Sequence, residues 1–96
     1  MDRDLNEMRH IFSSYLPIEK VILYGSRAKG NYKNGSDVDL SVLGQDISDD
    51  LISELIAILN EESMMPYHFD VVNYHKLTNS SLINHIDQIG KTIYIK

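Results

Sequence analysis

The sequence of 96 residues contains no cysteine, and this absence excludes three kinds of chemistry at once. Without thiols there is no disulfide framework, no cysteine-ligated zinc site and no thiolate nucleophile. No apolar run approaches the roughly 20 residues that a membrane-spanning helix needs. The charged start of the chain is not followed by the apolar core of a secretory signal. We therefore expect a cytoplasmic protein that does not bind membranes.

Positive charge is also scarce, because nine Lys and Arg residues stand against fourteen Asp and Glu residues, for a formal net charge of −5. A general nucleic-acid binder would show a basic excess instead, so we expect no nucleic acid among the partners. Four of the nine cations lie within 14 residues of one another, at Lys20, Arg27, Lys29 and Lys33. Residues 34–75 contain acids but no Lys or Arg. This pattern fits either a small anion bound together with metal cations or a solvated acidic surface.

Hydrophobic residues make up 43% of the chain, near the average for globular proteins, so we expect residues 1–96 to form a single small domain. Hydrophobic periodicity predicts alternating helices and strands. The expected helices cover residues 2–16, 27–33, 48–59 and 80–89, and the expected strands cover residues 20–24, 37–43, 67–73 and 92–95. Asn34 and Gly35 predict a turn. The order α-β-α-β-α-β-α-β indicates an α/β (α+β) fold, with helices packed on a mixed four-stranded sheet whose last strand lies at an edge.

Gly25 and Ser26 follow the first predicted strand and precede a predicted short helix. Backbone N–H groups at such a turn suit a phosphate, and a glycine lets the backbone approach the anion closely. The Ser26 hydroxyl can add a donor, and Arg27 and Lys29 add positive charge nearby. Taken alone, a Gly-Ser pair is more often an ordinary turn, so this segment is a candidate nucleotide-binding site only in combination with other residues.

Asp37 and Asp39 begin the second predicted strand, and residues two apart on a strand point to the same face. Their carboxylates repel each other unless a cation, a proton or water intervenes. Mg²⁺ is the natural cation, since it is commonly held by one or two carboxylates plus substrate phosphates. Asp70 lies in an otherwise apolar strand, and if that strand pairs beside residues 37–43, three carboxylates converge and can hold two metal ions. The ordinary alternatives are an Asx turn at Asp37 and a strand-end cap at Asp70.

The order Gly25-Ser26 and then Asp37-Val38-Asp39 resembles the motif of the DNA polymerase beta nucleotidyltransferase superfamily. The surrounding segment LYGSRAKGNYKNGSDVDLSVL is similar to the smallest branch, the minimal nucleotidyltransferases. The segment HFDVV and the last strand, from Gly90 to Tyr94, fit the same branch. The resemblance covers nearly the whole chain and implies a nucleotidyltransferase-like fold.

By this resemblance Gly25 and Ser26 hold the phosphates of the nucleotide, and Asp37 and Asp39 bind Mg²⁺. Asp70 is then the third carboxylate, which completes the metal site and activates the incoming hydroxyl. The implied reaction transfers a nucleoside monophosphate, with ATP or another nucleoside triphosphate as substrate and pyrophosphate as the leaving group.

Minimal members of the branch are commonly encoded beside an all-helical HEPN protein, in what looks like a toxin–antitoxin pair in which the transferase modifies a HEPN tyrosine with AMP. The resemblance therefore implies a HEPN-type helical partner and a protein acceptor. We expect no second domain in 96 residues, so acceptor recognition has to come from that partner or from a second copy of the chain. Four short strands with an exposed edge also favour a homo-oligomer.

Three functions stay open at this stage: a Mg²⁺-dependent transferase, a non-catalytic nucleotide-binding subunit that neutralises a helical partner by contact, and a purely structural domain. The intact set of Asp37, Asp39 and Asp70 favours the transferase. His68 alternates with Asp70 and is expected on the same face. His75 and His85, like His10, show no ligand spacing, and we assign them no role.

Overall fold

The computed structural model describes residues 2–30 and 35–96, with only the backbone described at residue 2. Four strands form one sheet in the order β3-β2-β1-β4. β1 (Lys20–Tyr24) runs antiparallel to both of its neighbours, β2 (Val38–Leu43) and β4 (Lys91–Ile95). β2 and β3 (Phe69–Asn73) run parallel. The predicted mixed sheet of four strands is therefore confirmed, with the last strand at an edge.

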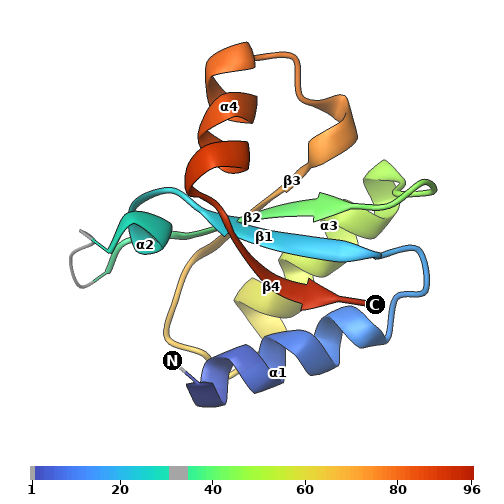
Figure 1. The fold of residues 1–96 in the computed structure, drawn as a ribbon. Helices are drawn as coiled ribbons and strands as arrows, with labels where there is room; N and C mark the ends of the chain where they lie inside the picture. Colours follow the sequence, from blue (N-terminus) through green and yellow to red (C-terminus); the bar gives the residue numbers. More distant parts are fainter. Residues whose placement is uncertain (1, 31–34) are drawn as a thin grey trace.

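Helices cover both faces of the sheet (Figure 1). α1 (Asp2–Ser13) and α3 (Asp49–Ala57) lie on one face, and α4 (Ser80–Ile89) lies on the other. The remaining helical segments are the short helix α2 (Ser26–Lys29), the π-helical turn η1 (Ile58–Glu62) and the 3₁₀ turn η2 (Tyr74–Lys76). None of the helices in the described part of the chain is long and apolar enough to cross a membrane.

The larger hydrophobic core lies between the sheet and the helices α1 and α3. Val38, Leu40 and Val42 of β2 are fully buried in this core. Because side chains alternate along a strand, Asp39 and Ser41 face the α4 side of the sheet. A smaller cluster on that side contains Ile22, Tyr24 and Ile86. The fold thus places the polar side of β2 beneath α4, next to the end of β1.

Three helices differ in their bounds from the prediction. Of the helix expected over residues 48–59, Ser48 is the N-cap of α3, and residues 58 and 59 belong to η1. The other two differences have local reasons. α1 ends at Ser13 instead of continuing to residue 16. The hydroxyls of Ser13 and Ser14 donate to the carbonyls of His10 and Ile11 at 2.7 and 2.6 Å, and such side-chain bonds compete with helix propagation. α2 spans Ser26–Lys29, because Gly30 caps it in the left-handed conformation with φ 83°. Residues 31–33 of the helix predicted over residues 27–33, and residue 34 of the predicted turn, lie outside the described residues.

Candidate active site

Gly25 forms the turn between β1 and α2, directly beside Asp39 of β2. It has φ 77° and ψ −157°, a conformation that residues with side chains rarely adopt. A Cβ atom at this position would overlap the Oδ2 atom of Asp39. Because Gly25 has no side chain, the backbone of the turn can pack against the carboxylate of Asp39. The predicted phosphate loop and a predicted metal ligand are therefore in contact.

Asp39 lies in a row of residues that crosses three strands. It pairs with Tyr24 of β1 on one side and with Asp70 of β3 on the other. Neighbouring strands are about 4.8 Å apart, and parallel partners in register present their side chains on the same face. The pairing that the sequence prediction required, with the strand of Asp70 beside the strand of Asp39, is therefore confirmed.

Asp37 lies just before β2, since the strand begins at Val38 and not at residue 37. The N–H of Val38 donates to the carbonyl of His68 at 2.9 Å. The Oδ1 atom of Asp37 lies 3.5 Å from Nδ1 of the same histidine, and both side chains are exposed. Asp37 is thus next to the row of Asp39 and Asp70 but turned toward the segment that leads into β3.

Asp39 lies at the centre of this group, and the neighbouring carboxylates repel its negative charge. Burial raises the pKa of Asp39 above its ordinary value, and the charges of Asp70 and Asp37 raise it further, while His85 lowers it. Burial raises the pKa of Tyr24 to about 12, together with the neighbouring charges of Asp39 and Asp70. A cation placed among these groups would relieve the repulsion and keep Asp39 ionised.

The donor atoms suit Mg²⁺, which prefers carboxylate oxygens and substrate phosphates. However, no group of three or more His, Asp or Glu side chains in residues 2–30 and 35–96 is arranged closely enough to hold a metal ion without other ligands. The carboxylates therefore offer a partial set of ligands, and a triphosphate would have to complete the coordination sphere.

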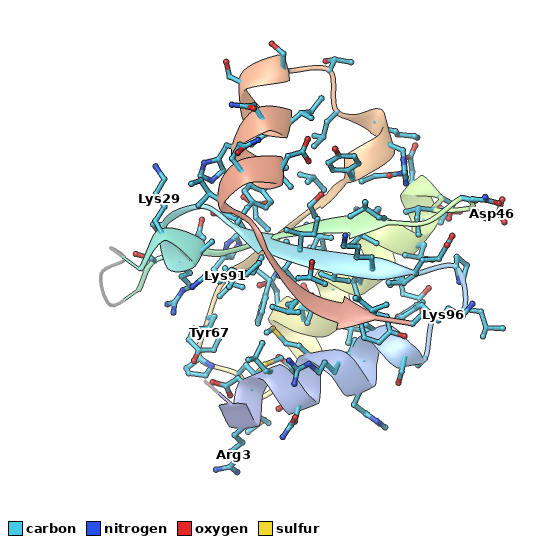
Figure 2. All side chains as sticks on the ribbon, viewed as in Figure 1. Arg3, Lys29, Asp46, Tyr67, Lys91 and Lys96 are labelled. Carbon is cyan, nitrogen blue, oxygen red and sulfur yellow. The ribbon has the colours of Figure 1, made fainter. Side chains whose placement is uncertain are left out.

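Arg27 and Lys29, the two cations of α2, have different surroundings. The Nε and Nη2 atoms of Arg27 donate to the carbonyl of Ser36 at 3.1 and 3.0 Å. Its guanidinium also lies 4.7 Å from the centre of the Tyr67 ring, within the range of a cation–π contact. Arg27 therefore ties α2 to the residues just before β2. Lys29 is exposed on the α2 side of the molecule, far from Asp46 (Figure 2).

Two residues at the site are missed by the sequence analysis. His85 of α4 accepts the N–H of Gly25 at its Nε2 atom, at 3.0 Å, and its ring contacts Tyr24 edge-on. Asn60 of η1 pairs with the backbone of Phe69 through both its amide oxygen and its amide nitrogen. The N–H of Phe69 thus donates to the Asn60 side chain at the start of β3. The strand begins at Phe69 and not at residue 67 as predicted. Neither residue lies in a local motif, so the sequence alone offers no signal for them.

Comparisons with known proteins agree with this arrangement. A family model described as "Polymerase beta, Nucleotidyltransferase" matches residues 6–96. No curated protein matches the sequence. A solved toxin–antitoxin structure with AMP-PNP superposes with a TM-score of 0.74 at 20% identity, over 99% of this chain and 73% of that one. A tri-AMPylated HEPN toxin of Shewanella oneidensis in complex with an MNT antitoxin gives a TM-score of 0.74 at 18% identity, over 99% of this chain and 72% of that one.

Proposed function

Since the chain belongs to the polymerase beta nucleotidyltransferase family, as its motifs predict, we propose that it transfers AMP from ATP to a protein acceptor with the help of Mg²⁺. We further propose that residues 1–96 act as one nucleotidyltransferase domain. In this proposal the chain is the antitoxin of a toxin–antitoxin pair, and the acceptor is its helical, HEPN-type partner.

The observation that carries the proposal is the packing of the Gly25 turn against Asp39, with Asp70 in register on the next strand. This packing places a backbone turn suited to phosphate beside two carboxylates suited to Mg²⁺. A structural role alone gives no reason to keep Asp39 where burial and two like charges raise its pKa. Perturbed titration in such a cluster is typical of functional sites.

We assign the binding roles as follows. The Gly25 turn and the Ser26 hydroxyl hold the phosphates of ATP, and Lys29 adds positive charge to them. Arg27 contributes charge from its place against Ser36. Asp37, Asp39 and Asp70 would hold Mg²⁺, with two ions when all three take part, and the metal would offset the negative charge of the triphosphate.

The reaction step assigned to Asp70 is the removal of a proton. The oxygen of the acceptor hydroxyl forms a bond to the α-phosphorus of ATP while the bond from that phosphorus to the pyrophosphate oxygen breaks. The hydroxyl proton passes to a carboxylate oxygen of Asp70, which is exposed and therefore accessible to an acceptor. General-base assistance of this kind typically contributes about 10²–10⁴-fold in rate.

The acceptor and the partner are proposed from the solved structures that share the fold. One of them is a toxin–antitoxin pair with AMP-PNP, and another holds a HEPN toxin that carries AMP groups together with an MNT antitoxin. The net charge of −5 supports a protein acceptor over a nucleic acid.

A second candidate is a nucleotide-binding subunit that neutralises its partner without catalysis. It is favoured by one observation, that the described side chains do not form a metal site by themselves. The two candidates differ in one measurable property, since only the transferase moves AMP to the partner.

Binding and transfer can be separated with Asp70→Asn, which keeps the shape of the side chain and removes its charge. We expect wild type to bind ATP with Mg²⁺ more tightly than ATP alone in calorimetry, and to transfer labelled AMP to the co-expressed partner. Asp70→Asn should retain most of the affinity, because Asp37 and Asp39 still offer carboxylates to one Mg²⁺ and the lost charge also repels the triphosphate. Its transfer rate should fall about 10²-fold or more. Asp39→Asn should lose the effect of Mg²⁺ on binding.

The matched control is Asp46→Asn, the same chemical change at an exposed site that follows the far end of β2 and lies far from Lys29 in Figure 2. It should leave both binding and transfer unchanged. Wild-type transfer rates in Asp70→Asn would remove the general base from the proposal. ATP binding without any transfer in wild type would establish the second candidate.

A further inference from the structure

His85 connects α4 to the turn that we propose as the phosphate loop. Its Nε2 atom accepts the N–H of Gly25 at 3.0 Å, and the two residues are 60 positions apart in the sequence. The half-buried imidazole ring also lies edge-on to Tyr24, with the ring centres 6.1 Å apart. The last residue of β1 and the first residue of the turn are thus both held by one side chain from the helix above them.

Gly25 needs such support because its conformation is unusual. With φ 77° and ψ −157° it occupies a region open to glycine, and glycine is also the most flexible residue in the unfolded and the locally open chain. On the sheet side, the close approach to Asp39 limits where the backbone can move. On the helix side, the bond to His85 fixes the direction of the peptide N–H. The turn is therefore held from both sides in one conformation.

We propose that His85 is a positioning residue, whose imidazole holds the Gly25–Ser26 turn in the conformation that receives the triphosphate. The inference rests on the proposed function, since the turn has to bind phosphate for its conformation to matter. Because Nε2 accepts a hydrogen bond, the imidazole proton lies on Nδ1. The bond also occupies the N–H of Gly25, so the contribution of Gly25 is its missing side chain, and the donors to phosphate come from Ser26 onward.

The chain contains a matched histidine with the same kind of bond away from the site. His75 of η2 accepts the N–H of Gly44 at its Nε2 atom, at 3.2 Å, just beyond the far end of β2. Both histidines thus link a helical turn to the backbone next to a strand end. A purely structural role predicts the same consequences for the loss of either bond, whereas a positioning role predicts a difference in nucleotide binding.

Three variants test the proposal: His85→Phe, which keeps an aromatic ring but has no acceptor, His85→Gln, and His75→Phe as the control. The side-chain amide oxygen of Gln lies about as far from Cα as Nε2 does and can accept the same N–H. We expect His85→Phe to raise the Kd for ATP with Mg²⁺ by about three- to tenfold, the effect of one lost hydrogen bond. His85→Gln should stay close to wild type, and His75→Phe should bind as wild type does.

Hydrogen exchange of the Gly25 amide, measured by NMR in the free proteins, gives a readout that needs no nucleotide. It should be about three- to tenfold faster in His85→Phe than in wild type, and restored in His85→Gln. His85→Leu replaces the Phe variant if the latter does not fold. Unchanged Gly25 exchange and unchanged affinity in the variants without an acceptor would overturn the proposal, as would an equal loss of affinity in His75→Phe. If wild type binds no ATP, the proposed function fails, and Gly25 exchange still decides whether His85 holds the turn.

Discussion

Because Gly25 has no side chain, the proposed phosphate loop can pack directly against Asp39, one of the proposed metal ligands. A glycine there allows the close approach of a phosphate, and the structure adds a second reason for a glycine, the contact with Asp39. Gly30 is the natural comparison, because it also has a positive φ, of 83°, but a Cβ added to it would meet no atom within 4 Å. The two glycines therefore share a positive φ but differ in packing and in ψ, which is −157° at Gly25 and 4° at Gly30, in the left-handed region.

We expect Gly25→Ala to lower the free energy of unfolding by about 1–3 kcal/mol, because the new Cβ combines backbone strain with an overlap on Asp39. Gly30→Ala should cost about 1–2 kcal/mol from backbone conformation alone. Only Gly25→Ala should also abolish ATP binding in the presence of Mg²⁺, since relief of the overlap displaces either the turn or the carboxylate. Urea unfolding and calorimetry of both variants measure the two effects. Equal affinities in the two variants would contradict the role given to Gly25.

At the scale of elements, the π-helical turn η1 determines where β3 begins. The Nδ2 atom of Asn60 donates to the carbonyl of Phe69 at 2.9 Å, and the N–H of Phe69 donates to Oδ1 of the same side chain at 2.7 Å. This two-bond clamp holds the residue immediately before Asp70. A π-helical turn inserts extra backbone into a helix and is often found near functional sites. Here it fixes the start of the strand that carries the third carboxylate.

Asn60→Leu tests the clamp, with Asn73→Leu as its control at the other end of β3. Asn73 likewise makes two hydrogen bonds, from its Nδ2 to the carbonyl of Ile47 and from the N–H of His75 to its Oδ1. Each variant should lose about 1–3 kcal/mol of folding stability, since each hydrogen bond contributes roughly 0.5–1.5 kcal/mol. Only Asn60→Leu should reduce AMP transfer. Chemical denaturation and the labelled-AMP assay give both numbers, and equal transfer in the two variants would show that the clamp does not position Asp70.

The sequence predicts the elements better than the links between them. Alternation along residues 37–43 and the helical stripe of residues 80–89 reflect burial on one face, which is a local pattern. α4 has the expected bounds, and β2 begins one residue later than expected, at Val38. The Gly25-Ser26 turn and the pair of Asp37 and Asp39 are likewise local. The contacts of His85 and Asn60 depend on tertiary packing between separate segments. A single polar residue in a helix does not indicate which backbone group it will bind.

For the whole molecule, the topology explains why four segments contribute to one site. β1 and β2 are antiparallel and β2 and β3 are parallel, so the end of β1 meets the beginnings of β2 and β3 at one end of the sheet. α4 then packs over that end and supplies His85 (Figure 1). The carboxylates therefore lie at the same end of the sheet as Arg27 and Lys29. Residues 44–62, which include α3 on the face opposite to α4 (Figure 1), are acidic and contain no Lys or Arg.

This distribution of charge leads to a prediction about the acceptor. A polynucleotide is bound mainly through its phosphates by clustered Lys and Arg, whereas this chain has a net charge of −5, with nine Lys and Arg residues against fourteen Asp and Glu residues. We therefore expect no binding of labelled RNA or DNA in fluorescence anisotropy at low salt, where non-specific binding is strongest. AMP transfer to the protein partner should also be insensitive to added RNA. Micromolar binding that weakens steeply as salt is raised would contradict this expectation, because it would show that a cationic surface gathers phosphates of a polymer, and the acceptor would then have to be sought among nucleic acids.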